Sequence, residues 1–391
     1  MSSSLRIIVS GLIVQYPLGG VTWDYLQYVV GLKRLGHDVY YLEDTGLWPY
    51  HPGEDGLARE PTYHVAYLSE IMSRYGLGDR WAYCFPHETQ WFGLPDVDRA
   101  TLLETADLLI NVSCALQRPS RFRHIGRTAL IDTDPVFTQV KLARGQNDFR
   151  TAVDAHDIHF SYGECLPGAT SETGHRWHPM RKPILLSEWN PSAPHRDVYT
   201  TVMNWTSFND LTFNGQRYGQ KDAEFVHFFD LPGKVAPAVL EMAVGAGKTR
   251  RVPRDLLVHK GWRVVDPSDV CASFDAYRDY IEGSKAEWTV AKQGYVVGQS
   301  GWFSGRSACY LAAGRPTVVQ DTGFGPVLPC GEGILAFRTF EEAVDAIRRV
   351  EDDYQRHAVA ARSIAETYFD SDKLLSRLVA VAMNGDSGDS P

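Results

Sequence analysis

The sequence predicts an α/β protein built from two similar domains, each with a parallel sheet at its centre. Its 391 residues exceed what one ordinary hydrophobic core accommodates. Short apolar strands alternate with amphipathic helices through both halves of the chain, which is typical of α/β domains. The stretch at 189–196, WNPSAPHR, combines two prolines with Asn and Ser, and it separates the two series as a linker.

We therefore assign residues 1–190 to an N-terminal domain and residues 191–350 to a C-terminal domain. Helices are expected at the end of the chain, over 351–383. The short polar tail at 384–391 is expected to be disordered.

The composition is that of an ordinary globular protein, with 44% hydrophobic and 22% charged residues. A net charge of −9 argues against a duplex nucleic acid as a partner held through its phosphates. The six cysteines form no CxxC pair, so we interpret them as core residues in a reducing compartment. The sequence shows no signal peptide and no apolar run of about 18 residues, so a cytoplasmic protein without a membrane span is expected.

The first elements form a βαβ unit. Residues 5–10 are a continuous apolar strand of the kind that is buried on both faces of a sheet. A helix follows, with Thr22 as its expected N-cap and Gly36 as its C-terminal stop. A second strand at 39–42 completes the unit, which predicts parallel pairing with a right-handed crossover.

The remaining elements of the first half continue this alternation, with a loop at 86–95. Helices are expected at 65–75 and 99–105, and strands at 108–112, 127–131 and 158–162.

The second half repeats the pattern. Strands are expected at 199–205, 262–265 and 288–291, and helices at 222–230, 274–281, 340–350, 353–368 and 373–383. Leu231-Pro232-Gly233 should close the helix at 222–230. The segment at 239–243 fits either a strand or a helix.

The stretch at 299–324, QSGWFSGRSACYLAAGRPTVVQDTGF, carries the strongest functional signal. It predicts a turn, a short helix, a turn, a strand and a last turn. Gly314 and Pro316 end the helix, and the apolar residues 317–320 form the strand.

Polar groups crowd the entrance of that short helix. Ser300, Ser304 and Ser307 supply hydroxyls, and Arg306 supplies a planar donor fork suited to phosphate oxygens. Gly301 allows a close approach to the backbone. A helix N-terminus of this kind binds anions, although a Ser-capped helix with a solvent-facing Arg is the alternative interpretation.

Asp321-Thr322-Gly323-Phe324 follows the strand at 317–320 directly. Ligands of open α/β sheets bind at the carboxyl ends of the strands. The helix entrance and this turn should therefore open onto the same edge of one sheet.

The order of these features resembles glycosyltransferases of the GT-B fold. The resemblance rests on the helix at 304–313, Gly314-Arg315-Pro316, the strand and Asp321-Thr322-Gly323. In the first half it rests on Gly19-Gly20 before a helix and on Leu35-Gly36-His37-Asp38-Val39 before a strand. It implies two Rossmann-like domains that face each other across a cleft, with the C-terminal helices packed back on the N-terminal domain.

The resemblance also implies a nucleotide-sugar co-substrate, a UDP- or dTDP-sugar, with its diphosphate at the short helix and no resident cofactor. The residues assigned to the donor are Lys221, Ser300, Gly301, Trp302, Ser304, Arg306, Ser307, Asp321, Thr322, Gly323 and Phe324. Many retaining members carry two Glu residues, seven apart, beside this helix. This sequence lacks that pair, so the sugar and the stereochemistry stay open.

The leaving diphosphate can be stabilised by a metal ion or by protein groups. Asp132-Thr133-Asp134 has the form of a metal-binding Asp-x-Asp, but it lies far in sequence from the phosphate helix, and Pro135 follows it. We expect instead that the helix dipole, Arg306 and Lys221 stabilise the charge without a metal. The alternative for Lys221 is an exposed lysine before a helix.

The acceptor must lose a proton to a base of the N-terminal domain. The candidates are Asp24 on the first helix and Asp132 and Asp134 at the end of a strand. His156 and Glu164, which flank another strand, are further candidates. The residues alone do not choose among them.

These features predict an enzyme that moves a sugar from a nucleotide-diphosphate to a hydroxyl or similar nucleophile of a small molecule, a glycan or a modified nucleobase. Aromatic groups that either line the acceptor pocket or pack in the core are Tyr40, Tyr41, Trp81, Tyr83, Trp91 and Phe92. The alternatives are a nucleotide-sugar epimerase or hydrolase of the same fold, a catalytically silent nucleotide- or glycan-binding protein, and a dinucleotide-dependent oxidoreductase. The oligomeric state stays open.

Overall fold

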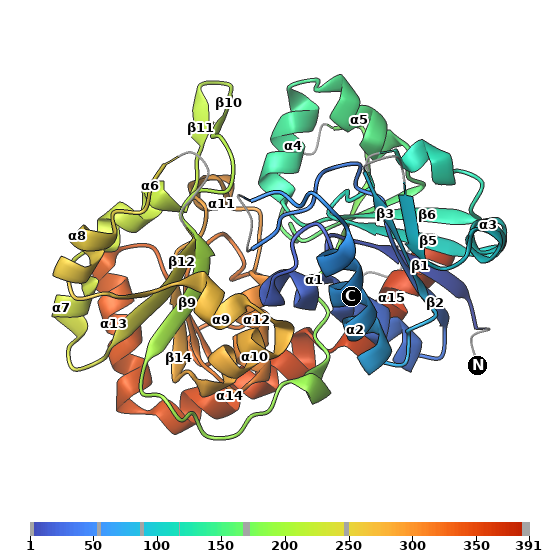
Figure 1. The fold of residues 1–391 in the computed structure, drawn as a ribbon. Coiled ribbons are helices and arrows are strands. Elements are labelled where there is room, and N and C mark those ends of the chain that lie inside the picture. The colour runs from blue at the N-terminus through green and yellow to red at the C-terminus, as the bar shows by residue number, and fades with distance from the viewer. Residues whose placement is uncertain are drawn as a thin grey trace.

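The computed structural model describes residues 4–52, 56–86, 90–116, 118–166, 173–245 and 250–384. The chain forms two α/β domains that lie side by side (Figure 1). The N-terminal domain, in blue to green, contains an eight-stranded sheet, and the C-terminal domain, in yellow to red, a six-stranded sheet. The predicted fold class is confirmed.

The N-terminal sheet is parallel apart from one edge strand. In spatial order its strands are β4 (Gln90–Gly93), β3 (Trp81–Phe85), β2 (Asp38–Glu43), β1 (Arg6–Ser10), β5 (Leu108–Val112), β6 (Arg127–Asp132), β7 (Ile158–Ser161) and β8 (Trp177–Pro179). The β3–β4 pair is antiparallel, and the other neighbours pair in parallel. The strand order reverses between β1 and β5, and ligands of such sheets bind at the carboxyl ends beside a reversal.

The helices of this domain are α1 (Gly19–Arg34), α2 (Thr62–Arg74), α3 (Asp96–Thr105), α4 (Pro135–Ala143) and α5 (Asn147–Asp154), with short turns η2 (Pro119–Phe122) and η3 (Leu186–Glu188). The predicted N-cap of the first helix is wrong. Leu18 takes that position in an extended conformation, and the Thr22 hydroxyl instead bonds the Tyr67 hydroxyl at 2.6 Å. Gly36 lies just past the helix end with a φ of +89°, as a C-terminal stop requires.

Several elements of this half differ from the predicted ones. The predicted loop at 86–95 contains the strand β4, and the strand β3 precedes it. Aromatic residues of the two strands stack across the pair, as Tyr83 and Phe92 do with ring centroids 6.5 Å apart. The sequence analysis also misses α4, α5 and β8. α4 begins at Pro135, and proline is favoured at the first helical position.

The C-terminal sheet pairs in parallel along its whole width. In spatial order its strands are β13 (Arg263–Val265), β12 (Leu240–Gly245), β9 (Tyr199–Asn204), β14 (Ala286–Thr289), β15 (Thr317–Gln320) and β16 (Ile334–Phe337). In chain order this is 3-2-1-4-5-6, the order of dinucleotide-binding domains. The ambiguous segment at 239–243 is therefore a strand, and β16 is an additional one. The reversal of strand order lies between β9 and β14.

Helices cover both faces of this sheet, and a hairpin follows β9. The elements are β10 (Leu211–Phe213), β11 (Gln216–Tyr218), α6 (Lys221–Phe225), η4 (Val226–Phe228), α7 (Leu231–Val235), α8 (Arg254–His259), α9 (Pro267–Cys271), α10 (Phe274–Gly283), α11 (Gln293–Gly298), α12 (Gly305–Ala312), α13 (Phe340–Asp352), α14 (Tyr354–Tyr368) and α15 (Ser371–Asn384). The predicted helix end at Leu231-Pro232-Gly233 is wrong, because these residues open α7 with Pro232 in its first turn.

Two stretches of chain cross between the domains side by side. The first leads from β8 to β9, and the second leads from α14 to α15. Ile184 of the first forms a β-bridge with Asp370 of the second, in which its N–H donates to Phe369 O at 2.8 Å and its carbonyl accepts from Ser371 N at 3.0 Å. α15 then packs on α1 (Figure 1), so the predicted return of the C-terminal helices is confirmed.

An apolar cluster joins the two domains. The ring of Trp23 in α1 lies 5.3 Å from that of Trp189 in the first crossing stretch and 5.8 Å from that of Phe274 in α10. Its indole N–H donates to the Phe274 carbonyl at 2.8 Å. All three side chains are buried. Apolar burial of this kind holds the domains against each other.

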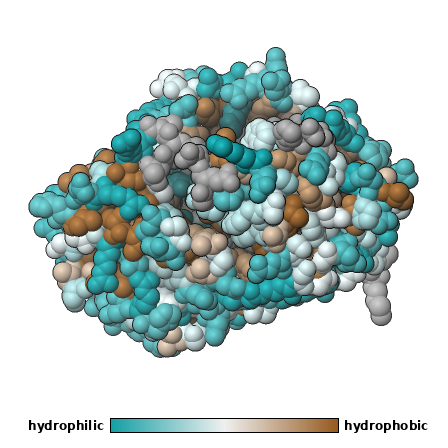
Figure 2. All heavy atoms as spheres, in the orientation of Figure 1, coloured by the Kyte–Doolittle hydropathy of each residue, from teal (hydrophilic) through white to brown (hydrophobic). Residues whose placement is uncertain are grey.

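On the surface, Figure 2 shows apolar residues in separate patches among hydrophilic ones. Among the described residues, no helix has both the length and the hydrophobicity needed to cross a membrane. The domain boundary at 189–196 stays a prediction. The predicted disordered tail lies outside the described residues, apart from Asn384.

Candidate active site

The carboxyl-terminal edges of the two sheets face each other. Cys165, which follows β7, donates its N–H to Ser300 O at 2.8 Å. The indole N–H of Trp302 donates to the carbonyl of Thr133, which follows β6, at 3.2 Å. Ser300 and Trp302 lie between β14 and α12. The stretch at 299–324 therefore meets the strand ends of the N-terminal domain.

Gly301 is a point of very close approach between the domains. A Cβ on Gly301 would lie 2.8 Å from the backbone nitrogen of Cys165 and 2.9 Å from its Sγ. The φ of Gly301 is +78°, a conformation that residues with a Cβ rarely adopt. The sequence analysis assigns this glycine to the approach of a ligand, whereas its neighbour in the structure is Cys165.

Replacing Gly301 with alanine should destabilise the protein through two separate effects. The left-handed backbone costs about 1–2 kcal/mol for a residue with a Cβ. The overlap with Cys165 adds about 1–3 kcal/mol of overpacking. Chemical denaturation measures the sum. Gly215→Ala is the matched control, because Gly215 has a φ of +76° and open space around its missing Cβ. Equal losses for the two variants would show that the contact with Cys165 contributes nothing.

A small cavity lies at the carboxyl end of β14, beside the first turn of α12. Its volume is about 20 Å³, which is room for about one water molecule. The residues that line it are Lys221, Thr289, Val290, Ala291, Trp302, Phe303, Ser304, Arg306, Ser307, Val319, Gln320, Thr322 and Phe324. Most of the predicted donor residues thus converge on one place. A nucleotide occupies several hundred Å³, so its entry requires the domains or these side chains to move apart.

The first turn of α12 offers free backbone donors. Ser304 precedes the helix without a capping hydrogen bond from its side chain. Among the described residues, the first backbone N–H of the helix with a partner belongs to Ala308, which donates to Ser304 O at 3.0 Å. The Ser307 hydroxyl is buried without a hydrogen-bond partner among the described residues. Unpaired N–H groups at the positive end of a helix are the groups that bind phosphate oxygens.

Lys221 adds an unpaired cation to this cavity. Within the described ranges, its ammonium has no hydrogen-bond or ion-pair partner, although the residue lines the cavity. Burial lowers the pKa of Lys221 well below its ordinary value; the charges of Arg306 and Lys292 lower it further, and Glu287 opposes them. Lys221 is only partly buried, and an ammonium that loses part of its hydration without a counter-ion destabilises the fold. The position is therefore suited to an anion that arrives from outside.

Arg306, by contrast, is neutralised inside the domain. Its Nε donates to Glu287 Oε1 at 2.6 Å, and its two other nitrogens donate to Val202 O at 2.6 Å and Thr289 Oγ1 at 2.9 Å. Although burial lowers the pKa of Arg306, the Glu287 carboxylate raises it above its ordinary value. Arg306 thus ties the first turn of α12 to the sheet. Its contact with a donor stays a prediction.

The Asp-Thr-Gly turn supports the loop that precedes α12. The Asp321 carboxylate accepts from the N–H of Gly323 at 2.9 Å and pairs with Arg338 at 2.6 Å. The Thr322 hydroxyl donates to the carbonyl of Trp302. These polar atoms are used by the protein itself. The turn positions the site, and direct donor binding by Asp321 and Gly323 stays a prediction.

Aromatic rings form the remaining walls. Trp302 stacks on Tyr295 of α11 with ring centroids 4.2 Å apart and an interplanar angle of 14°. Phe324 is buried against Phe303 at 5.2 Å. Ser300 is fully buried, and its hydroxyl has no hydrogen-bond partner in the described part of the chain.

Asp24 is the candidate base that lies against α12. A Cβ on Gly305, the first residue of α12, would lie 3.3 Å from Asp24 Oδ1. The Asp24 side chain is 54% exposed, and its carboxylate pairs with Lys182 Nζ at 2.9 Å. The predicted base and the predicted phosphate helix, far apart in sequence, are therefore neighbours.

The other two candidate carboxylates are held by protein groups. Asp132 accepts from Thr138 Oγ1 at 2.7 Å and Ser161 Oγ at 3.0 Å, and burial raises its pKa to about 6. Asp134 pairs with Lys292 of the other domain at 2.8 Å; although burial raises the pKa of Asp134, Lys292 lowers it below its ordinary value. Asp132 thus fixes the loop after β6, and Asp134 fixes the contact between the domains.

The remaining candidates are also engaged by the protein. His156 contacts Asn111 Nδ2 at 3.1 Å and Ala152 O at 3.0 Å, and burial lowers its pKa to about 4. Glu164 pairs with Arg181 at 2.6 Å, and burial raises its pKa. In the described ranges, no group of three His, Cys, Asp or Glu side chains is arranged to hold a metal ion.

The aromatic groups considered for the acceptor mostly belong to the N-terminal core. Tyr41, Trp81 and Tyr83 are buried. Phe92 stacks on Tyr83, and Trp91 packs under the guanidinium of Arg99 at 4.2 Å. Their interpretation as packing residues is therefore supported.

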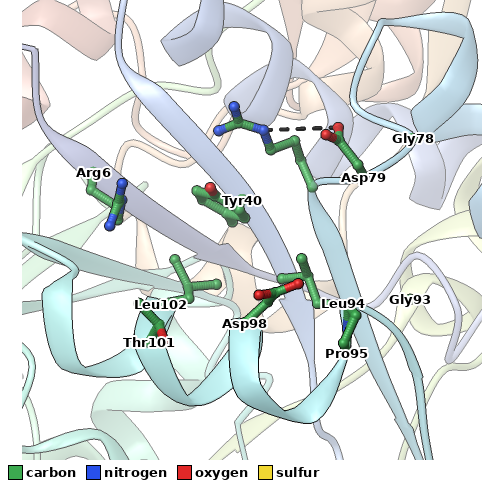
Figure 3. A pocket seen from close by; sticks show the side chains of 11 residues that line it. Arg6, Tyr40, Gly78, Asp79, Gly93, Leu94, Pro95, Asp98, Thr101 and Leu102 are labelled. Carbon is green, nitrogen blue, oxygen red and sulfur yellow. Dashed lines mark ion pairs between the residues drawn. The ribbon is translucent and has the colours of Figure 1, made fainter.

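Tyr40 lines a separate pocket of about 420 Å³. Figure 3 shows its ring beside Arg6 and above the helix that carries Asp98, Thr101 and Leu102. Arg6 opens β1, and Gly78 and Asp79 precede β3, so this pocket lies at the amino-terminal ends of the strands. It is at the opposite edge of the sheet from the site that faces the C-terminal domain.

Three charged residues of the site escape the sequence analysis: Lys182, Glu287 and Lys292. Glu287 is a single carboxylate inside a buried strand, AEWT, which is a signal of an internal partner. Lys292 follows β14 closely, as functional residues of α/β sheets often do. Lys182 has no comparable signal, because its role depends on contacts with two distant helices.

No family model and no curated protein matches the sequence. Solved structures match it over nearly the whole chain. An α-glucosyltransferase in complex with UDP-glucose and DNA containing an abasic site is 14% identical with a TM-score of 0.57, over 98% of this chain and 100% of that one. HepE of Anabaena, solved with UDP and glucose, is 11% identical with a TM-score of 0.56, over 96% and 99% of the two chains. Sucrose-phosphate synthase of Thermosynechococcus elongatus is 11% identical with a TM-score of 0.54, over 96% and 97%.

The chain has the GT-B fold. In this GT-B chain, α12 and Lys221 lie on the C-terminal side of the domain interface, and Asp24 lies on the N-terminal side. The structural matches, at TM-scores of 0.57 and 0.56, support the fold alone, because the sequences are only 14% and 11% identical. The reaction has to be argued from the site.

Proposed function

We propose that this protein is a glycosyltransferase that moves a sugar from a nucleotide-diphosphate donor to a nucleophile of an acceptor. The observation that carries the proposal is the cavity at α12, where the free N–H groups of a helix N-terminus meet the unpaired ammonium of Lys221. Both kinds of group bind phosphate oxygens. The fold that this chain shares with proteins solved with UDP or UDP-glucose supports a UDP- or dTDP-sugar as the donor.

The negative charge that develops on the leaving diphosphate would be stabilised by the α12 N-terminus and by Lys221. Fixed donors of this kind need no reorganisation as the bond breaks, so they lower the barrier efficiently. They supply the role that a metal ion has in other sugar transfers, which supports a metal-independent reaction.

Asp24 would take the proton of the acceptor. Its carboxylate is exposed and lies at the first residue of α12, next to the place proposed for the diphosphate. Asp132 and Asp134 are held by other groups. The acceptor class, a small molecule, a glycan or a modified nucleobase, stays a proposal. The unpaired cysteines among the described residues support a reducing compartment such as the cytoplasm.

A thermal-shift series tests the donor. UDP, dTDP and their sugar derivatives should raise the melting temperature, because a ligand that binds the folded state at 100 times its Kd stabilises it by about 2.7 kcal/mol. NAD is the control, since a shift with NAD alone would favour an oxidoreductase. Absence of a shift with every nucleoside diphosphate would overturn the proposal.

Turnover with the donors that bind then separates the remaining alternatives. Transfer should require an acceptor. Sugar conversion or release at full rate without any acceptor would favour an epimerase or a hydrolase. Binding without turnover across a panel of small molecules, glycans and nucleobases would favour a silent binding protein.

A further inference from the structure

Lys182 is a buried lysine at the meeting point of three elements. Its side chain is 3% exposed. Its ammonium pairs with Asp24 Oδ1 at 2.9 Å and also donates to the Asp24 carbonyl in α1. Its stem touches α12, because a Cβ on Gly305 would lie 3.1 Å from Lys182 Cγ. The residue itself lies in the first crossing stretch, between β8 and η3.

Lysine is rarely buried unless its charge is paired. Here the partner, Asp24, is half exposed, so the pair joins an internal cation to a carboxylate that solvent and substrates can reach. Two bonds from one ammonium, to the side chain and to the backbone of Asp24, fix the carboxylate relative to its own helix. The paired oxygen, Asp24 Oδ1, also lies beside the first turn of α12, 3.3 Å from where a Cβ on Gly305 would be.

We propose that Lys182 is a positioning residue that holds the Asp24 carboxylate as an anion against the first turn of α12. The inference rests on the proposed function, in which Asp24 is the base and the diphosphate lies at α12. An incoming diphosphate would favour protonation of a neighbouring carboxylate, because like charges repel. The positive charge of Lys182 opposes this effect, so Asp24 can accept a proton while the donor is bound.

Other titratable groups around this pair do not change charge in an ordinary assay range. They are Tyr25, Tyr28, Tyr162, Tyr277 and Cys309, and they come from α1, the end of β7, α10 and α12. Burial raises the pKa of each of them, so all are neutral near pH 7. Burial also lowers the pKa of Lys182, and Asp24 raises it in part. A change in the pH profile of a Lys182 variant therefore does not arise from these five groups.

The test is the pH dependence of kcat/KM for the acceptor, measured at saturating donor, for Lys182→Met and Lys182→Arg. Loss of a positive charge within bonding distance disfavours the ionised form of a carboxylate. The acid limb of the Lys182→Met profile should therefore move to higher pH. Lys182→Arg keeps the charge, and its acid limb should stay at the wild-type position. Lys182→Gln, which keeps a polar group without charge, replaces the methionine variant if that variant does not fold.

An unchanged acid limb in the uncharged variants, at any level of activity, would overturn the inference, because a purely structural lysine changes the rate without moving the profile. Asp24→Asn separates this failure from others. That variant should keep the UDP thermal shift and lose transfer. Wild-type transfer by Asp24→Asn would remove Asp24 as the base and the inference with it. Absence of a UDP shift in the wild type would instead remove the proposed function.

Discussion

Replacing Arg306 with methionine should lower the free energy of unfolding by about 3–5 kcal/mol, the range for breaking a buried ion pair on one side. Glu287 is fully buried, and Arg306 Nε is the donor to its Oε1 at 2.6 Å. Its other carboxylate oxygen has no hydrogen-bond partner among the described residues. Without Arg306, the Glu287 charge stays in the interior with no compensation. Urea or guanidinium denaturation measures the loss.

The double variant Arg306→Met/Glu287→Met is the matched control. Replacing both members of a buried pair by apolar residues is often neutral, because no unpaired charge remains. The double variant should therefore recover most of the stability that the single variant loses. An Arg306→Met protein that is as stable as the wild type would show that the contact with Glu287 contributes little and that Arg306 is free to serve a ligand.

Replacing Lys221 with methionine should weaken nucleoside-diphosphate binding and stabilise the free protein at the same time. A hydrogen bond to a charged group contributes about 1.5–3 kcal/mol, so calorimetry should show a Kd about 10- to 150-fold higher. The free protein should melt at a slightly higher temperature, because a partly desolvated ammonium without a partner in the described ranges is replaced by an apolar side chain. Residues that bind a ligand but lower the stability of the ligand-free protein are typical of functional sites.

The sign of the pH dependence follows from the lowered pKa of Lys221. Its folded-state pKa lies below the ordinary lysine value, so between the two pKa values the unfolded chain binds more protons than the folded one. The penalty from Lys221 is therefore full below the folded pKa and disappears as the pH rises toward about 10.4, the ordinary value. The stability gain of Lys221→Met should shrink over the same interval.

Lys292→Met serves as the control for Lys221→Met. Lys292 is near enough to Lys221 to lower its pKa, but it pairs with Asp134 across the domains at 2.8 Å and lies 4.5 Å from the ring centroid of Phe208. Its removal should lower the melting temperature. A rise in melting temperature for both variants, or unchanged UDP affinity in Lys221→Met, would contradict the assignment of Lys221 to the diphosphate.

The fold was predictable because its signals are local. Apolar runs such as 5–10 and 108–112 mark strands that are buried on both faces, and the helices between them require parallel pairing. The same rule brings the α12 entrance and the turn after β15 to one sheet edge. The rule fails at β3 and β4, where an antiparallel edge pair rich in aromatic residues has no helix between its strands. The helix α4 was also not predicted, although it begins at Pro135 and proline is favoured at the first position of a helix.

The state of each charge in the site was not predictable. Arg306 and Lys221 look equally available in the sequence. In the structure, Glu287 pairs with Arg306 and neutralises its charge, whereas no described residue pairs with Lys221. The difference depends on which side chains meet after the strands are ordered, and these contacts join residues from separate elements. The position of Asp24 at α12 depends likewise on the packing of two domains.

The paired crossing stretches decide how the cleft can open. Two domains joined by a single linker could rotate and shift relative to each other in every direction. Here a single β-bridge between Ile184 and Asp370 ties the two crossings together, and sliding of one crossing past the other would break its hydrogen bonds to Phe369 and Ser371. Opening of the cleft would then also have to break the contacts that join the facing edges, such as Trp302 to Thr133 and Lys292 to Asp134.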